Sequence, residues 1–405
     1  MVAVSHQLPP EGNTDWYDHY GDLDAGVRNA SARINRKLPL RLQASPQVMT
    51  SPPTVTVSAE NAATTIASPQ TVAPDTTAIS RLGAGGFSLG DSYPFSLFQY
   101  PTSRYPHNVT DERNAPSPWT ALFGFDGSEL EFLVQGRVSS ATYWLSVDGE
   151  RVTSAPQTPG YGSGAGYRIK LAFGAAKRRI IQIDMSQVPW GGLTIGPTDT
   201  VWPVTPRGPR VIFVGDSYLG GAYTQPMATF YRACSDLLGW QDVWNDGFGS
   251  TGYVVAGYSA KFAARVAGDV VAYAPDIVVF AGGINDAGHT TAEVEAEALS
   301  CFTQVKTALP NTLVIATGPW VASGDTSAYV AVRNGIRNAA QATGATFIDT
   351  VDAPWITGSG HVGGLTGSGN ADRYIAADGV HPTAAGSEYL GCRLAEAILA
   401  SVPAL

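Results

Sequence analysis

The stretch VIFVGDSYLGG, residues 211–221, decides the fold of the C-terminal half of the chain. Its first four residues are apolar without alternation, which is typical of a strand covered on both faces of a parallel sheet. The run ends at Gly215-Asp216-Ser217, so a serine hydroxyl follows the carboxyl end of the predicted strand. Ligands of open α/β sheets bind at that end, which makes Ser217 a candidate nucleophile. An isolated tripeptide of this kind more commonly caps the next helix, so distant stretches must decide between the two readings.

Strand and helix patterns alternate from residue 207 to residue 405. Three further unalternated apolar runs are DIVVFAGG, NTLVIATG and ATFID, which begin at residues 276, 311 and 345. The segments between them keep apolar residues on one helical face, and a capping box from Thr290 to Glu293 precedes one of these segments. The two faces comprise Met227, Tyr231, Cys234 and Leu238, and Val294, Ala298, Cys301, Val305 and Leu309. This half is predicted to be a three-layer α/β domain with about five parallel strands.

Residues 79–206 show period-two alternation instead. In YRIKLAFG, residues 167–174, every second side chain is apolar, as a half-buried strand requires. Asp148-Gly149 lies between two strand-like segments and predicts a type I′ hairpin turn. Similar short strands recur with no helical pattern between them. We therefore expect an antiparallel β-sandwich of jelly-roll type.

Residues 1–78 form a third, more polar zone. A helix is plausible over residues 22–38, and a stretch rich in Pro, Ser and Thr follows over residues 43–77. Neither part carries enough periodic apolar residues for a core of its own. This zone is expected to be an arm or linker.

Composition excludes several classes of function. The net charge of −9 disfavours a nucleic-acid binder, which needs a basic face. The three cysteines are not paired in a C-x-x-C motif, and the histidines show no metal-ligand spacing, so no metal and no cofactor are expected. No apolar run approaches the roughly 20 residues of a membrane span. The N-terminus lacks the pattern of a secretory signal, which predicts a cytoplasmic protein unless a signal has been removed.

A serine nucleophile needs a base, and ADGVHPTAAG near the C-terminus offers one. His381 lies three residues after Asp378, in a loop ahead of a helix expected from about Thr383. This spacing lets the carboxylate accept from one ring nitrogen while the other faces Ser217. An ordinary histidine in a surface loop is the alternative reading of the same residues.

Acyl transfer also needs hydrogen-bond donors for the oxyanion that forms. Asn285 follows the predicted strand in FAGGINDAG, so its amide is expected at the same sheet edge as Ser217. The turn in WNDGFGSTGY, residues 244–253, offers backbone N–H groups after another strand. Each turn alone is common in α/β folds, but the carboxyl ends of parallel strands bring these stretches to one edge.

Residues 207–405 resemble the SGNH hydrolases, also known as GDSL-like esterases and lipases. Four blocks carry the resemblance: GDS at 215–217, the glycine-rich turn at 245–252, G-x-N-D at 283–286 and D-x-x-H at 378–381. The resemblance implies Ser217 as nucleophile, His381 as base and Asp378 as its partner. It also implies an oxyanion hole made by the Ser217 N–H, a backbone N–H of the second block and the Asn285 amide. A gapless reading places Ser250 rather than Gly249 at the family glycine of that block, and a serine donates equally well there if its φ is ordinary.

Ester hydrolysis is therefore the expected reaction. The polar stretch TGSGHVGGLTGSGN, residues 357–370, favours a short acyl group on a polar carrier over a lipid. His361 in this stretch either touches substrate or is an exposed loop histidine. Tyr218 and Trp320 either stack on sugar rings or pack in the core. A lipase, thioesterase or polyester hydrolase remains an alternative.

The order of domains resembles two-domain carbohydrate O-acetylesterases, which implies an acetylated polysaccharide or cell-surface glycan as substrate. Residues 15–38 resemble the start of tail-appendage proteins of bacteriophages that infect actinobacteria. This second resemblance implies that the arm attaches the enzyme to a virion, which carries it to the host surface. A non-catalytic glycan-binding component of a virion or adhesin is the alternative from another functional class.

Overall fold

The computed structural model describes residues 47–59, 62–73, 76–82, 96–100, 103–107, 119–136, 141–159, 165–186, 188, 190–220, 228–257, 260–361 and 365–402. The helix expected over residues 22–38 lies outside these residues, as does the expected attachment arm up to residue 46. Within the described ranges, no helix is both long and apolar enough to cross a membrane.

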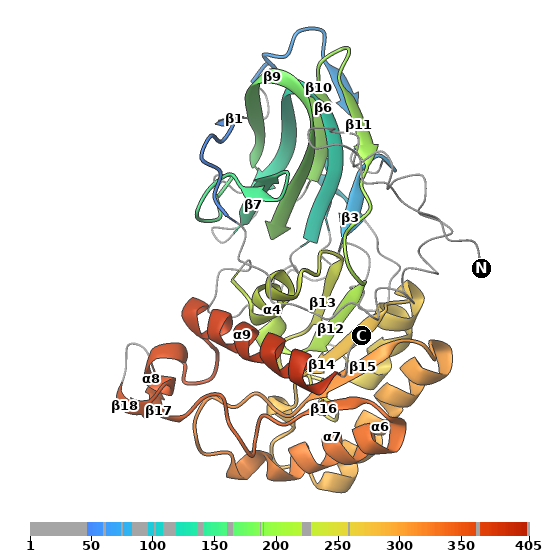
Figure 1. Cartoon of the computed structure of the whole chain (residues 1–405), viewed down its shortest axis with the longest axis vertical. Coiled ribbons are helices and arrows are strands. Elements are labelled where there is room, and N and C mark those ends of the chain that lie inside the picture. Colours follow the sequence, from blue (N-terminus) through green and yellow to red (C-terminus); the bar gives the residue numbers. More distant parts are fainter. Residues whose placement is uncertain are drawn as a thin grey trace, which may run out of the picture. The chain divides into compact units, whose positions relative to one another are not determined.

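A five-stranded parallel sheet organises the C-terminal half and confirms the predicted α/β class (Figure 1). Its order is β13-β12-β14-β15-β16, and every neighbouring pair is parallel. The strands span Val243–Gly247, Val211–Gly215, Ile277–Ala281, Leu313–Thr317 and Thr346–Ile348 in that order. The chain runs from β12 to β13 on one side and then crosses to β14 on the other. The carboxyl ends of these three strands therefore surround a topological switch point, where α/β sheets bind ligands.

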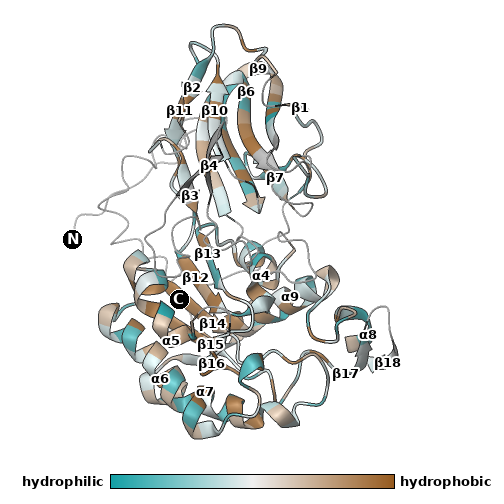
Figure 2. Cartoon of the chain, turned by 180° about the vertical axis from the view of Figure 1, so that it is seen from behind, coloured by the Kyte–Doolittle hydropathy of each residue, from teal (hydrophilic) through white to brown (hydrophobic). Residues whose placement is uncertain are grey.

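Helices cover both faces of this sheet, as Figure 1 shows. The face that carries Ile212 and Phe280 packs against α5 (Phe262–Arg265), α6 (Thr291–Ala308) and α7 (Val330–Thr343). On the other face, Phe213 contacts the rings of Phe230 and Tyr231 in α4 (Phe230–Leu238), and α4 packs against α9 (Ala384–Ser401). Figure 2 shows the apolar colouring of β12 and β14 between helices whose outer sides are more polar.

The capping box predicted for α6 is present. The Thr290 side chain accepts a hydrogen bond from the Glu293 N–H, and the Glu293 carboxylate accepts one from the Thr290 N–H at 2.8 Å. The two bonds satisfy N–H groups that the first helical turn leaves without partners.

Several short elements complete this half. They are α3 (Ser217–Gly220), η2 (Val266–Val270), η3 (Val271–Tyr273), η4 (Ile284–Asp286), η5 (Ser327–Tyr329), α8 (Ala371–Tyr374), and the strands β17 (Gly358–His361) and β18 (Leu365–Gly369), which pair as a hairpin.

The preceding region is an antiparallel β-structure, as expected. Its strands include β3 (Ser80–Leu82), β6 (Trp119–Gly136), β7 (Thr142–Val147), β8 (Glu150–Arg151), β9 (Ala165–Ser186), β10 (Trp190–Ile195) and β11 (Thr200–Pro203). A separate antiparallel pair consists of β4 (Ser96–Tyr100) and β5 (Ser103–His107).

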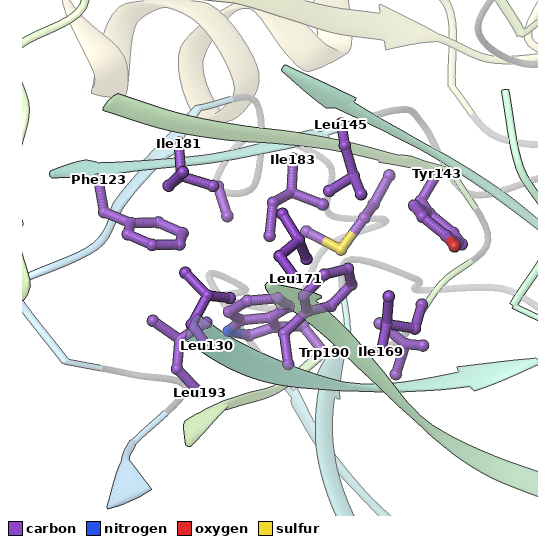
Figure 3. Close-up of a cluster of buried hydrophobic side chains, with 14 of the residues drawn as sticks. Phe123, Leu130, Tyr143, Leu145, Ile169, Leu171, Ile181, Ile183, Trp190 and Leu193 are labelled. Carbon is purple, nitrogen blue, oxygen red and sulfur yellow. The ribbon is translucent and has the colours of Figure 1, made fainter. Parts of the chain in front are cut away.

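The two long strands build both layers of the sandwich. β6 and β9 pair along their lengths, with a break in register between Gly127 and Glu129. Figure 3 shows the result: Phe123 and Ile181 lie in one layer, whereas Leu130 and Ile169 lie in the layer that faces it. All four side chains are buried. The hydrophobic core therefore lies between the two halves of the β6–β9 pair, on either side of the break in register.

Residues 54–72 correct part of the expected linker. The strands β1 (Thr54–Ala59) and β2 (Gln70–Val72) pair with β9 and β10, so this part of the expected arm belongs to the sheet. The sequence showed no sign of β1 because this strand contributes little to the core: all its residues except Val55 are exposed. The proposed domain boundaries at residues 78 and 206 stay predictions.

The turn predicted at Asp148-Gly149 joins β7 to β8. Both residues have positive φ, 52° and 89°, as a type I′ turn requires. Glycine adopts this conformation without strain, and aspartate tolerates it better than most residues.

Candidate active site

Ser217 begins α3 immediately beyond β12, where the sequence predicted a nucleophile. The turn between the two elements is tight. A Cβ placed on Gly215 would lie 2.4 Å from the carbonyl oxygen of Ala281 and 2.6 Å from Cδ1 of Leu219. Only glycine fits where the end of β12 passes so close to β14 and to α3.

His381 lies beside this serine although 164 residues separate them in the chain. Its Nε2 is 2.7 Å from Oγ of Ser217, and its Nδ1 is 2.5 Å from Oδ2 of Asp378. The side chains of His381 and Asp378 are 18% and 19% exposed, so both remain reachable from solvent. The structure therefore brings the three predicted catalytic residues into one line of hydrogen bonds.

Asp378 is held as a carboxylate. Its Oδ1 accepts from the N–H groups of Val380 and His381, each at 3.1 Å, while Oδ2 faces the imidazole. Burial raises the pKa of Asp378, but the hydrogen bonds from the imidazole and the two backbone groups outweigh it and lower the pKa below its usual value. A charged Asp378 fixes the orientation of the ring and stabilises an imidazolium.

Asn285 and the second block supply candidate donors for an oxyanion. The Asn285 amide donates one hydrogen bond to the carbonyl oxygen of Thr251 at 2.9 Å, which fixes its orientation. A Cβ placed on Gly249 would lie 4.0 Å from Cβ of Ser217, so this glycine adjoins the nucleophile. Ser250 has a left-handed φ of +61°, so the condition of an ordinary φ is not met at this position.

Asp286 holds the second block in place, a role that the sequence did not reveal. Its buried carboxylate accepts hydrogen bonds from three consecutive backbone N–H groups, those of Tyr253, Val254 and Val255, at 2.8 to 3.0 Å. A Cβ on Gly252 would lie 2.4 Å from this carboxylate, so only glycine lets the backbone wrap it so closely. Aspartate after Asn285 therefore anchors the loop against which the amide rests.

Arg265 is a second buried residue near the site that the sequence did not reveal. Its guanidinium donates to Oδ1 of Asp246 at 2.7 Å and to the carbonyl oxygen of Gly215 at 3.2 Å. Its side chain is 3% exposed. Arg265 thus joins β13, through Asp246, to the end of β12 at Gly215, two residues before Ser217.

Asp216 is buried within this group of charges. Its Oδ1 accepts from the Tyr218 N–H at 3.0 Å. Burial raises the pKa of Asp216 to about 7; the negative charge of Asp286 adds to this, while the Tyr218 N–H and Arg265 oppose it. Asp216 is therefore a candidate for titration near neutral pH inside the fold.

Other expectations concerned aromatic and histidine contacts with substrate. Tyr218 and Trp320 are only 2% and 3% exposed and pack with ring centroids 6.4 Å apart, so stacking on a sugar ring is wrong for both. His361 is half-buried in β17, and a Cβ on Gly379 would lie 3.9 Å from its Nδ1. His361 therefore lies against the loop that carries Asp378 and His381.

No cofactor or metal was expected. Among the residues that the structure describes, no group of three or more His, Cys, Asp or Glu side chains is placed to hold a metal ion. Cys234 and Cys301 are buried and Cys392 is partly buried, all three as free thiols.

The hydroxyl of Ser217, the imidazole of His381 and the carboxylate of Asp378 thus lie in contact beyond the carboxyl end of β12, and the Asn285 amide follows the neighbouring strand β14. This chemistry suits nucleophilic attack on an acyl carbon, since a proton acceptor lies 2.7 Å from the hydroxyl.

Comparisons with known proteins found one matching family model and several solved structures with a similar fold. Residues 213–389 match the model of the GDSL-like lipase/acylhydrolase family, and a search of curated proteins found no match. A family two carbohydrate esterase from Cellvibrio japonicus has a TM-score of 0.57 and 15% identity, covering 81% of this chain and 96% of its own. A salicylyl-acyltransferase from a tetracycline biosynthetic pathway has a TM-score of 0.60 and 15% identity, covering 83% and 99%. An acetyl xylan esterase from the rumen bacterium Butyrivibrio proteoclasticus has a TM-score of 0.53 and 12% identity, covering 82% and 98%.

Proposed function

We propose that the chain is a serine esterase of the GDSL-like lipase/acylhydrolase family, whose model matches residues 213–389, and that it removes O-acetyl groups from a polysaccharide. The observation that carries the proposal is the line of contacts from Ser217 Oγ to His381 Nε2, at 2.7 Å, and from His381 Nδ1 to Asp378 Oδ2, at 2.5 Å. A protein that only bound glycans would have no physical need for this alignment.

The proposed reaction has two halves. Oγ of Ser217 attacks the acyl carbon while His381 Nε2 takes the hydroxyl proton; the imidazolium then returns this proton to the departing alcohol oxygen, and an acyl-enzyme remains. In the second half a water molecule gives a proton to His381 and attacks the acyl carbon. The acid departs, and the proton returns to Ser217.

The oxyanion that forms in each half needs stabilisation. The amide of Asn285 carries a second N–H besides the one directed at Thr251. We assign this group, together with the backbone N–H groups of Ser217 and Gly249, to the developing negative charge. Gly249 is assigned here because it adjoins the nucleophile, and Ser250 stays the alternative donor of the second block.

Two considerations support an acetylated glycan as substrate. Two of the structurally similar proteins are a carbohydrate esterase and an acetyl xylan esterase, although their 15% and 12% identity establishes a shared fold only. The β17–β18 hairpin near the catalytic loop is rich in glycine, serine and threonine, which suits a polar carrier better than a long acyl chain.

We further propose that the N-terminal arm attaches the enzyme to a virion that acts at the host cell surface. The support is the sequence resemblance of residues 15–38 to phage tail-appendage proteins. Antibody against the chain should label purified particles of the phage that encodes it. Label that stays with the cytoplasmic fraction or with secreted protein would overturn the attachment but not the esterase activity.

The substrate proposal is tested by measuring acetate release from a panel of acetylated polysaccharides and from 4-nitrophenyl acetate. We expect release by the wild type and by Ser300→Ala, a control at an exposed site on α6, and none by Ser217→Ala.

Other outcomes have separate meanings. Equal inertness of the wild type and Ser217→Ala with retained glycan binding would make the chain a binding component. A preference for long acyl esters would make the chain a lipase. A preference for thioesters would make it a thioesterase, and a preference for polyesters would make it a polyester hydrolase. Acyl transfer to an added sugar hydroxyl, rather than to water, would make it an acyltransferase.

A further inference from the structure

Tyr218 links the element that carries the nucleophile to the loop that carries the base. It follows Ser217 in α3, and its phenolic O–H donates a hydrogen bond to the carbonyl oxygen of Val380 at 2.5 Å. Val380 directly precedes His381. One side chain next to the nucleophile therefore holds the backbone next to the base.

The loop is tied down at its base by other bonds. The Ala376 N–H donates to the carbonyl oxygen of His381 at 2.8 Å, and the Gly379 N–H donates to that of Ala376 at 3.0 Å. These contacts, like those of Asp378 with the backbone of Val380 and His381, lie within the loop. They set its internal shape but do not set its distance from Ser217. The hydrogen bond from Tyr218 to Val380, by contrast, joins this loop to α3, the helix that carries Ser217.

Tyr218 is itself rigidly held. It is 2% exposed, and its ring centroid lies 5.7 Å from that of His381 and 6.4 Å from that of Trp320. Trp320 in turn packs against Phe230 and Trp355, with centroids 4.4 Å and 5.2 Å apart. Burial raises the pKa of the Tyr218 phenol well above its usual value, so the phenol keeps its proton and remains a hydrogen-bond donor at neutral pH.

We infer that Tyr218 is a positioning residue, which sets the distance between His381 Nε2 and Ser217 Oγ by anchoring the backbone of Val380 to α3. This inference rests on the proposed esterase mechanism, in which that distance governs proton transfer. General-base catalysis requires a heavy-atom separation of about 2.6 to 3.2 Å, and a displacement of about 1 Å costs up to about 100-fold in rate.

Tyr218→Phe removes the donor and leaves the ring packing. The variant loses one hydrogen bond, and the resulting loss of stability depends on whether water replaces the donor at the Val380 carbonyl oxygen, so the unfolding midpoint is measured beside the kinetics. We expect kcat to fall about 10- to 100-fold with KM unchanged, because the loosened loop lowers the fraction of enzyme in which His381 is aligned.

Tyr389→Phe is the matched control. The Tyr389 hydroxyl also donates to a backbone carbonyl, that of Trp355 at 3.1 Å, and this bond does not involve residues 378–381. Both variants and the wild type are reacted with a fluorophosphonate, which forms a bond to an activated serine without any sugar or acyl recognition. The rate of inactivation, kcat and KM for 4-nitrophenyl acetate, the unfolding midpoint, and amide exchange at residues 379–381 are measured for each.

We expect the inactivation rate and kcat to fall together in Tyr218→Phe and to stay at the wild-type value in Tyr389→Phe. Amide exchange in the loop should rise only in Tyr218→Phe. A wild type that reacts at Ser217, with Tyr218→Phe equal to it in rate and in loop exchange, would overturn this inference and leave the proposed function intact. A wild type that does not react at Ser217 would overturn the proposed function and this inference with it. If Tyr218→Phe unfolds readily, unchanged loop exchange in its remaining folded fraction still contradicts the inference.

Discussion

The side-chain amide of Asn285 donates to the carbonyl oxygen of Thr251 at 2.9 Å, which holds it at the edge of the sheet where Ser217 lies. Asn285→Ala removes this oriented donor and should lower kcat by about 100- to 1,000-fold, with little change in KM, because an oxyanion exists only in the transition state and the intermediate. Steady-state kinetics on 4-nitrophenyl acetate provide the measurement. Asn338→Ala, which alters an amide on α7 paired with Glu295, should keep wild-type kcat. Equal rates for the wild type and Asn285→Ala would remove the amide from the oxyanion hole.

Asp378→Asn should lower kcat about 1,000- to 10,000-fold. The neutral amide cannot stabilise an imidazolium, and its N–H group favours the wrong tautomer of His381, which then offers a proton instead of a lone pair to Ser217. The same kinetic assay measures the effect, and Asp372→Asn in α8 serves as a control. A loss of less than about 10-fold would show that the ring is oriented by other contacts.

Asp216→Asn should change how stability depends on pH. The pKa of Asp216 is raised to about 7 in the fold from a usual value of 3.8, so the folded protein keeps a proton that the unfolded chain loses. Stability from this group is full at low pH and is lost as pH rises through the interval up to about 7. The uncharged asparagine removes this loss, so the variant should gain at least about 1 kcal/mol relative to the wild type between pH 5 and pH 8.

Urea unfolding at the two pH values measures the free energies for this comparison. The difference between the variant and the wild type matters, since Asp246 and Asp286, whose pKa values are also raised by burial, titrate in both proteins. A difference that is the same at both pH values would show that Asp216 does not titrate in this range.

Ser250→Gly should stabilise the fold. A left-handed φ of +61° costs a non-glycine residue roughly 1 to 2 kcal/mol, and glycine removes this cost. Because glycine loses more backbone entropy on folding than serine does, part of the gain is cancelled, and a net gain of about 0.5 kcal/mol is expected. Ser250→Ala keeps the Cβ and should show no gain. Activity should persist in both variants, because changing the side chain at position 250 leaves the backbone N–H groups of the second block in place. Denaturant midpoints measure the change, and a less stable glycine variant would contradict it.

Much of the fold and of the site follows from local sequence. Unalternated apolar runs indicate buried parallel strands, and the carboxyl ends of such strands share one edge, so motifs after β12 and β14 had to meet. The order of the GDS, G-x-N-D and D-x-x-H motifs therefore pointed to Ser217, Asn285, Asp378 and His381 before any coordinates. Their catalytic roles stay predictions.

The features that sequence missed depend on packing between distant segments. Nothing local shows that Arg265 pairs with Asp246, or that the Asp286 carboxylate collects three N–H groups from the second block. The aromatic residue Tyr218 looked equally suited to a sugar and to the core until its burial was seen. The edge strand β1 escaped notice because a mostly exposed strand leaves no apolar alternation in its sequence.

The proposed nucleophile, Ser217, follows the first strand of the parallel sheet, β12, whereas the proposed base, His381, precedes α9. A ribosome that has made the chain as far as α7 has produced most of the sheet but none of the base. Under the proposed mechanism, the nascent chain therefore gains no ester-hydrolysing activity until Asp378 and His381 have been synthesised and α9 has docked.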